Sequence, residues 1–280
     1  MLIDLHTHST ASDGTESPAA LVASAAAAGV DVVALTDHDT TAGWDEAAVA
    51  AGQHAITLVR GAELSCMARG ISVHLLSYLH DPRAPGLLAE TVAARESRVR
   101  RARRMVELVG QDYALEWADI EAQAGDGATL GRPHIADALV ARGHVATRDE
   151  AFATILRSGS PYFVSHYATD ALEAVRLVRV AGGVPVFAHP AAAQRGRTVP
   201  ESTVEAMAEA GMLGLEVDHR DHDQAARRRL RELADALGLF VTGSSDYHGA
   251  GKLNRLGENS TDPAALERIE AAGTVAVLRG

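Results

Sequence analysis

The sequence predicts an α/β fold in which seven strands form a barrel related to the (β/α)₈ type, interrupted by a helical insertion. Three observations lead to this prediction. Seven short apolar runs, rich in Val, Ile and Leu, end abruptly in polar residues. Alanine-rich stretches of helical length lie between most of these runs. A long middle segment has helical patterns and no comparable strand.

The seven apolar runs have the length and composition of strands that are buried on both faces. They cover residues 2–8, 30–39, 55–64, 71–79, 184–190, 212–219 and 237–248. The helical stretches between them include 17–29 and 201–211, and each closes on a glycine, the usual helix stop. Because strands and helices alternate, we expect a parallel sheet with crossover helices.

The middle of the chain is predicted to be a helical insertion between the fourth and fifth strands. We therefore divide the chain into a first barrel part (1–94), an insertion that caps the substrate (95–170) and a second barrel part (171–280). Six arginines lie between residues 95 and 104, against a single acid, and the chain's only lysine is Lys252.

Composition excludes several classes of protein. The formal charge of −11 argues against a nucleic-acid coat protein, but not against a small anionic substrate, because local charge matters more than the total. No apolar run approaches the roughly 18–20 residues that span a bilayer, and the N-terminal residues lack a signal-peptide pattern. A single cysteine, Cys66, excludes an internal disulfide and a thiolate metal cage. We expect a cytoplasmic protein with no membrane or specific protein partner.

Histidines and carboxylates gather at the predicted strand ends. His6 and His8 are two residues apart on the first strand, so their side chains point to the same face. Such a pair alone is weak evidence, but similar residues recur at other strand ends. The nine candidate metal ligands are His6, His8, Asp13, His38, Glu63, His74, His189, Asp246 and His248. In a parallel barrel the carboxyl ends of strands meet on one face, where active sites are built.

The ligand types restrict the metal. Imidazole and carboxylate ligands without thiolate suit Mn²⁺, Zn²⁺ or Fe²⁺. Nine ligands are too many for one ion, whereas three ions with three protein ligands each fit the number. Such ions convert a bridging water to hydroxide near neutral pH and clamp the attacked phosphoryl group. The pattern therefore predicts a hydrolase.

These motifs resemble the PHP family, named for polymerase and histidinol phosphatase domains and allied to the amidohydrolases. The resemblance covers nearly the whole chain. It rests on Asp-Leu-His-Thr-His-Ser (4–9), Ser-Asp-Gly (12–14), Thr-Asp-His-Asp (36–39), Gly-x-Glu (61–63), His-Pro (189–190) and Ser-Asp-x-His (245–248). It implies a distorted (β/α)₇, TIM-like barrel with two or three metal ions, of which Mn²⁺ is our first choice.

The resemblance also implies how the ligands are shared. One ion would be held by His6, His8 and Asp246. A second would be held by His74 and His189, with Glu63 bridging to the first. The third would be held by Asp13, His38 and His248. Asp13, Glu63, Asp246 and His248 are the expected catalytic residues, while Asp37 and Asp39 would orient ligands rather than bind ions.

Two stretches of the insertion, 131–144 and 151–164, resemble bacterial nucleoside 3′,5′-bisphosphate phosphatases and the related 5′–3′ exoribonucleases. The resemblance implies hydrolysis of the 3′-phosphate of a nucleotide that carries phosphates at both positions, giving the 5′-monophosphate. The alternatives are a 5′–3′ exoribonuclease on short 5′-phosphorylated RNA and a catalytically inactive metal-binding module. The expected partner is a small nucleotide or a short RNA.

A 5′-phosphate away from the metal ions needs its own arginine clamp, because a guanidinium matches phosphate geometry bidentately. The candidate substrate-binding residues are Arg132 and His134, then Arg157 and Arg104, with Ser72 donating to the metal-bound phosphate. Arg98, Arg101 and Arg103 are expected on a solvated helix face.

The remaining histidines fall into two groups. We expect the first group on the surface or in helix caps: His54, His80, His144 and His166. His219 and His222 follow the sixth predicted strand on the active-site face, so a role in substrate binding or proton transfer stays open for them.

Overall fold

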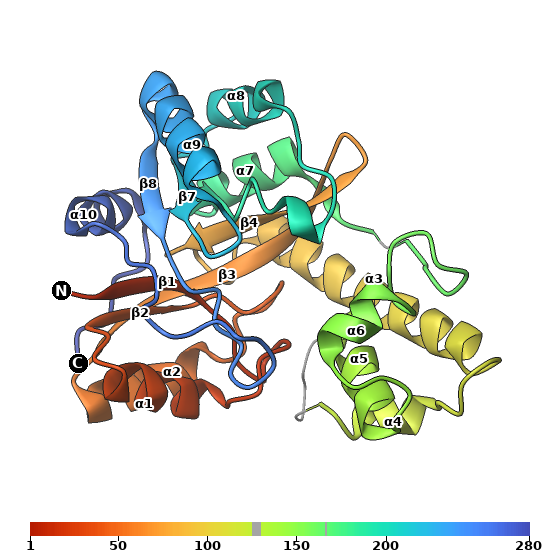
Figure 1. Ribbon diagram of the computed structural model, residues 1–280. Coiled ribbons are helices and arrows are strands. Elements are labelled where there is room, and N and C mark those ends of the chain that lie inside the picture. Colours follow the sequence, from red (N-terminus) through yellow and green to blue (C-terminus); the bar gives the residue numbers. More distant parts are fainter. Residues whose placement is uncertain (125–129, 166) are drawn as a thin grey trace.

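The computed structural model describes residues 1–124, 130–165 and 167–280 (Figure 1). Seven strands form a curled sheet in the order β1-β2-β3-β4-β6-β7-β8. Their bounds are Ile3–Thr7 (β1), Val32–Leu35 (β2), Thr57–Ala68 (β3), Ile71–Tyr78 (β4), Val184–Phe187 (β6), Gly214–Asp218 (β7) and Phe240–Gly243 (β8). The two-residue β5, Thr169–Asp170, pairs with β3 outside this path. A bridge between Thr7 and Tyr247 brings the first and last strands together, so the barrel is nearly closed, as predicted.

The expectation of an all-parallel sheet is wrong at β4. This strand runs antiparallel to both β3 and β6, whereas the other neighbours along the path are parallel. Arg69 and Gly70 join β3 to β4 with φ angles of 51° and 72°. Two residues with positive φ form the tight turn of an antiparallel hairpin, and they leave no chain for the crossover helix that a parallel pair requires.

Six helices cover the barrel: α1 (Pro18–Ala27), α2 (Trp44–His54), α7 (Ala171–Val180), α8 (Glu201–Glu209), α9 (Gln224–Leu237) and α10 (Pro263–Ala272). Side chains cap the first turns of two of these helices. Ser17 accepts a hydrogen bond from the backbone N–H of Ala20 at the start of α1, and Asp223 accepts one from the N–H of Ala226 at the start of α9. One core cluster packs β2 and β3 against α1 and α2, and another packs the β3–β7 region against α7 and α9.

The insertion has a core of its own. Its helices are α3 (Pro85–Val109), α4 (Trp117–Glu121), α5 (Arg132–Ala141) and α6 (Arg148–Ala153). Met105, Ile135 and Leu139 are completely buried in one cluster there. Figure 1 shows α4, α5 and α6 beside the far half of α3, to one side of the barrel. The boundary expected at Arg95 lies inside α3, because this helix buries Leu87 in the barrel core and Met105 in the insertion core.

None of the helices in the described ranges is long and apolar enough to cross a membrane.

Candidate metal centre

The nine predicted ligands converge at one end of the barrel. Their side chains are buried, except that His74 is 25% exposed. His6 lies on β1, and His8 and Asp13 follow it; His38 follows β2, His189 follows β6, and Asp246 and His248 follow β8. Glu63 and His74 come from the antiparallel pair β3 and β4, where His74 is opposite Ser65. His74 therefore lies in the middle of β4, whereas the ligands on the parallel strands lie at or just after the strand ends.

Glu63 is the centre of this arrangement. Its Oε1 lies 2.7 Å from Nδ1 of His74 and 3.1 Å from Nε2 of His189. Its Oε2 lies 3.2 Å from Nε2 of His8 and 3.2 Å from Nδ1 of His38, with Nε2 of His6 at 3.4 Å. Each carboxylate oxygen thus faces a different set of imidazoles, which is the arrangement of a carboxylate that bridges two ions.

Three groups of ligand atoms are close enough to hold a cation. Within each group all the ligand atoms lie within 4.8 Å of one another. The groups are His8 with Asp13, His38 and His248; His6 with His8 and Glu63; and His38 with Glu63 and His74. Oδ1 of Asp246 adds to the second group, at 3.5 Å from Nε2 of His6 and 3.4 Å from Nε2 of His8.

Two buried histidine nitrogens of this site lack hydrogen-bond partners among the described residues and suit the binding of a cation. Within the described ranges, Nδ1 of His38 and Nε2 of His248 are buried and make no hydrogen bond. An imidazole nitrogen with a lone pair and no proton donor to satisfy it is costly in a protein interior. Divalent ions would satisfy these lone pairs, and the buried carboxylates would balance the ions' charge.

The pKa values of two buried carboxylates favour the charged form that binds cations. Burial alone would raise the pKa of Glu63, but the neighbouring His74, His38 and His6 outweigh it and hold that pKa well below its usual range. The pKa of Asp13 is likewise well below its usual range, because His248 and His38 outweigh burial. Burial, followed by the charge of Lys252, lowers the pKa of His248 to about 4. The carboxylates of Glu63 and Asp13 are therefore ionised at neutral pH.

The predicted set of site residues did not include Glu216, which belongs to this site. It is fully buried on β7, where its Oε1 lies 2.9 Å from Nδ1 of His6 and its Oε2 accepts the backbone N–H of His189 at 2.8 Å. Both partners are predicted metal ligands. The available signal was an acidic residue in the middle of an apolar strand, since a buried charge needs a partner.

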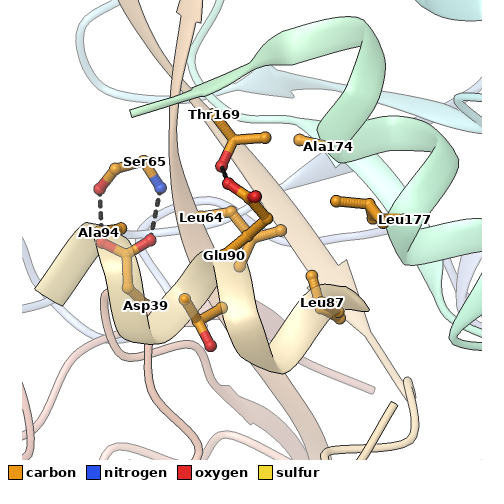
Figure 2. Close-up of a pocket in the computed structure, with 10 residues that line it drawn as sticks. Asp39, Leu64, Ser65, Leu87, Glu90, Ala94, Thr169, Ala174 and Leu177 are labelled. Atoms are coloured by element: carbon orange, nitrogen blue, oxygen red, sulfur yellow. Dashed lines mark hydrogen bonds between the residues drawn. The ribbon is translucent and has the colours of Figure 1, made fainter. Parts of the chain in front are cut away.

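Asp37 and Asp39 hold the loops that carry the ligands. Asp37 accepts hydrogen bonds from the backbone N–H and the hydroxyl of Ser9 and from the hydroxyl of Ser12, which fixes the loop leading to Asp13. Asp39 accepts from the backbone N–H of Ser65 at 2.8 Å and from its hydroxyl at 2.6 Å (Figure 2).

A small pocket lies next to Asp39, between α3, β3 and α7 (Figure 2). Its lining combines Asp39 and Glu90 with the aliphatic side chains of Leu64, Leu87 and Leu177. Glu90 accepts a hydrogen bond from Thr169 across this space. The described lining includes none of the nine ligands, so this pocket is separate from the metal centre.

Two predicted substrate-binding residues, Arg132 and His134, lie at the start of α5, and His134 is close enough to the metal centre to feel the charge of Asp13. His134 is buried, and its Nδ1 accepts the backbone N–H of Gly131. Burial lowers the pKa of His134, although the negative charge of Asp13 acts in the opposite direction. Arg132 is half-buried over the ring of Phe152. Arg132 also donates a 3.5 Å hydrogen bond to the carbonyl of Leu156.

Arg98 and Arg101 of α3, which were expected in solvent, are partly buried. The side chain of Arg98 is only 13% exposed and pairs with Asp39 at 3.1 Å. Arg101 donates to the carbonyl of Val164. Burial, together with the positive charges of Arg132 and Arg98, lowers the pKa of Arg101 to about 9. Neither Arg101 nor Arg132 has a carboxylate partner among the described residues.

The other predicted substrate residues lie differently. Arg104 is 58% exposed and pairs with Glu107 at 2.7 Å, so it sits on the solvent face of α3 and does not reach the centre. The reason is helical phase: Arg98 and Arg101 are three residues apart and share a face, whereas Arg104 is turned away from Arg98 by about a third of a turn. Arg157 and Ser72 are exposed, and Ser72 lies two residues before His74 on β4.

Two further histidines can be assigned. His80, expected on the surface, is buried, with Nδ1 2.8 Å from the hydroxyl of Ser77. His222 is satisfied by the backbone, because it donates to the carbonyl of Val217 and accepts from the N–H of Ala191. His166 lies outside the described residues.

The insertion also contacts the barrel close to the ligands of the last strand. Arg148 of α6 forms an ion pair with Asp137 of α5. The same guanidinium donates to the carbonyl of Gly251, in the loop that follows His248, at 3.4 Å.

The chain is similar to several known proteins. Residues 4–124 match the family model of the PHP domain. A 3′,5′-nucleoside bisphosphate phosphatase from Chromobacterium violaceum is 35% identical over 260 residues, which cover 90% of this chain and 89% of the relative. A 5′–3′ exoribonuclease from Haemophilus influenzae is 35% identical over 260 residues, covering 91% and 93%. The crystal structure of a Bifidobacterium adolescentis protein assigned as a metal-dependent phosphoesterase has 41% identity and a TM-score of 0.95, covering 97% of this chain and 96% of that one.

Proposed function

The chain belongs to the PHP domain family and is a metal-dependent hydrolase of phosphate esters, and we propose that it releases the 3′-phosphate from nucleoside 3′,5′-bisphosphates. The products would be the nucleoside 5′-monophosphate and inorganic phosphate. The bisphosphate phosphatase from Chromobacterium violaceum, which matches along 90% of this chain, supports this choice of substrate.

The observation that carries the proposal is a pair of arginines, Arg101 and Arg132, apart from the nine candidate ligands. Arg101 and Arg132 are partly buried, crowd each other with positive charge, and have no carboxylate partner in the part of the chain that is described. Guanidinium groups in such surroundings favour a phosphate, to which they can donate bidentately. A substrate with two phosphates would place one at the metal centre and the other at these arginines.

In this proposal the residues divide the work. His6, His8, Asp246, Glu63, His74, His189, Asp13, His38 and His248 would hold two or three divalent ions, for which Mn²⁺ is our choice. When bound, the ions would supply a hydroxide near neutral pH and neutralise charge on the phosphoryl oxygens. Arg132 and His134 would bind the 5′-phosphate and so set which phosphate faces the ions. We infer that residues 95–170 act as the cap that carries this second position.

A direct test compares adenosine 3′,5′-bisphosphate with 5′-AMP on Mn²⁺-loaded protein. Phosphate release is measured, and the nucleotide product is separated by chromatography. We expect rapid release from the bisphosphate, with 5′-AMP as the product, and slow release from 5′-AMP itself. Equal rates on the two substrates, or a 3′-monophosphate as the product, would contradict the proposal.

A second candidate function is 5′–3′ exoribonuclease activity on short 5′-phosphorylated RNA. The Haemophilus influenzae relative, whose match covers 91% of this chain, favours it. The same arginines would then bind the 5′-phosphate of the first nucleotide, and the bond broken would be a diester. Stepwise loss of 5′ nucleotides from a 5′-phosphorylated oligonucleotide, with no loss from a 5′-hydroxyl one, would support this candidate.

A further inference from the structure

We propose that His219 and Lys252 form a positioning pair that holds one oxygen of Asp246, so that only the other oxygen reaches the metal ions. Neither residue belongs to the nine ligands. The inference rests on the metal centre and is independent of which phosphate ester is the substrate.

The two oxygens of the Asp246 carboxylate have different neighbours. Oδ1 faces the ligand imidazoles, at 3.5 Å from Nε2 of His6 and 3.4 Å from Nε2 of His8. Oδ2 accepts a hydrogen bond from Nζ of Lys252 at 3.1 Å. Nε2 of His219 lies 3.6 Å from the same Oδ2. One side of the carboxylate therefore meets metal-ligating nitrogens, and the other side meets two groups that can donate.

The hydrogen bonds of His219 fix which of its nitrogens carries the proton. Its Nδ1 accepts the backbone N–H of Asp221 at 3.0 Å, so this nitrogen presents a lone pair. The proton of the ring is then on Nε2, the nitrogen that faces Asp246. His219 is completely buried, and its Nε2 makes no hydrogen bond shorter than 3.5 Å within the described ranges. A small closing movement of Asp246 would complete this contact.

Lys252 lies in the loop after β8 and donates a hydrogen bond to the carboxylate of Asp246. It is the chain's only lysine, and its side chain is 33% exposed, so the ammonium can keep water on its remaining N–H groups while one N–H binds Asp246. The neighbouring carbonyl of Gly251 accepts from Arg148 of the cap. The lysine is thus anchored in a loop that the cap itself contacts.

A carboxylate that is free to rotate can offer a metal ion either oxygen or both. Two donors on Oδ2 favour one rotamer, in which Oδ1 points at the position shared with His6 and His8. Donors that orient a ligand in this way typically raise metal affinity by about 10–100-fold. We expect the His219–Lys252 pair to act on metal affinity by this route.

A competing explanation makes the opposite prediction for Lys252. If the ammonium merely neutralised surplus negative charge, it would repel a divalent ion, and removing it would tighten metal binding. If it positions Asp246, removing it weakens metal binding. The sign of the change in Mn²⁺ affinity therefore separates the two explanations.

The first experiment uses two uncharged substitutions of His219. His219→Gln retains a donor near the position of Nε2, whereas His219→Asn retains only the acceptor that binds the N–H of Asp221. Mn²⁺ affinity is measured by competition with a fluorescent chelator, and thermal unfolding of the metal-free proteins checks that all variants fold. We expect about 10–100-fold weaker binding for His219→Asn and affinity close to wild type for His219→Gln.

The second experiment compares Lys252→Met with Arg255→Gln in the same assay. Arg255 lies three residues away in the same loop, is 84% exposed and pairs with Glu258, so its loss removes the same charge without touching Asp246. Lys252→Met should weaken Mn²⁺ binding, and Arg255→Gln should not. Because the chain has one lysine, acetylating wild-type protein with an amine-reactive ester should reproduce Lys252→Met, and the same treatment of Lys252→Met should change nothing further.

A crystal structure of the Mn²⁺-loaded protein gives the direct test. We expect Asp246 to contact the ions through Oδ1 alone, with Lys252 and His219 on Oδ2. Asp246 bound through both oxygens, or tighter Mn²⁺ binding by Lys252→Met, would overturn the proposal. Failure of the bisphosphate assay would leave these measurements unaffected, since they require only metal binding.

Discussion

Oε1 of Glu216 lies 2.9 Å from Nδ1 of His6, and both side chains are completely buried. A carboxylate next to Nδ1 fixes the ring proton there, so that Nε2 presents its lone pair to the ligands around Glu63. The other oxygen of Glu216 accepts the backbone N–H of His189. One carboxylate on β7 therefore orients two predicted ligands that come from β1 and from the end of β6.

Glu216→Gln keeps the size of this side chain and removes its charge. An amide can no longer stabilise the proton on Nδ1 of His6 as strongly, so we expect about 10–100-fold weaker Mn²⁺ binding without loss of the fold. A chelator competition assay measures this. The matched control is Glu205→Gln, an exposed glutamate on α8, which should bind Mn²⁺ like wild type. Unchanged affinity in Glu216→Gln would show that Glu216 does not act through the ligands.

Metal binding should release protons at neutral pH. Burial opposes the charge on His8, but hydrogen bonds to Asp246 and Glu63 outweigh it and raise its pKa from 6.5 to about 9. In metal-free protein the charged His8 thus contributes stability that is fully present below pH 6.5 and is lost as the pH rises through about 9. An ion must displace this proton, so Mn²⁺ affinity should rise between pH 7 and pH 9.

Calorimetry in two buffers of different ionisation enthalpy measures the protons released per ion. We expect release at pH 7 that falls towards zero above the pKa of His8. If no proton is released at pH 7, His8 is already neutral in the metal-free protein.

The fold was largely predictable because each strand is an apolar run that ends in polar residues. The exception, β4, depended on whether Arg69 and Gly70 form a tight turn, and apolar patterning does not report strand direction. The nine candidate ligands were recognisable because they lie at strand ends or in motifs. Glu216 was not, since its partners come from strands that are far away in the sequence.

The arginines show a second limit of sequence analysis. Six arginines in ten residues predict a basic helix, but the face that turns inward depends on how α3 packs on the barrel and on α5. Arg104 was the predicted substrate residue, whereas the structure partly buries Arg98 and Arg101 and leaves Arg104 exposed. Helical spacing brings Arg98 near Arg101 and, equally, Arg101 near Arg104, so it does not indicate which arginines turn inward.

Arg132→Ala should separate binding of the distal phosphate from the chemistry. A hydrogen bond to a charged group contributes about 1.5–3 kcal/mol, so we expect roughly a 10–100-fold higher KM for adenosine 3′,5′-bisphosphate. Hydrolysis of a chromogenic monophosphate, which has no second phosphate, should stay near wild type. Arg104→Ala is the matched control and should leave both activities unchanged, because Arg104 is exposed and pairs with Glu107. Equal damage to both substrates by Arg132→Ala would make Arg132 a structural residue.

Asp13→Ala should have the complementary effect. Asp13 lies 3.4 Å from Nε2 of His248 and 3.9 Å from Nε2 of His38, so its loss leaves one group of ligands incomplete. We expect turnover of the bisphosphate and of the chromogenic monophosphate to fall together. Metal analysis of the purified variant should show fewer bound ions than wild type. A loss confined to the bisphosphate would contradict the assignment of Asp13 to the metal centre.

Leu139→Ala tests whether the cap folds as a unit apart from the barrel. Leu139 is completely buried in the core of the insertion, and removing such a side chain costs about 2–5 kcal/mol. We expect faster hydrogen exchange in α4–α6, a higher KM for the bisphosphate and an unchanged number of bound Mn²⁺ ions. Leu215→Ala, in the barrel core, is the contrasting variant and should lower stability and metal binding together. If Leu139→Ala also loses its metal ions, the insertion and the barrel form one cooperative unit.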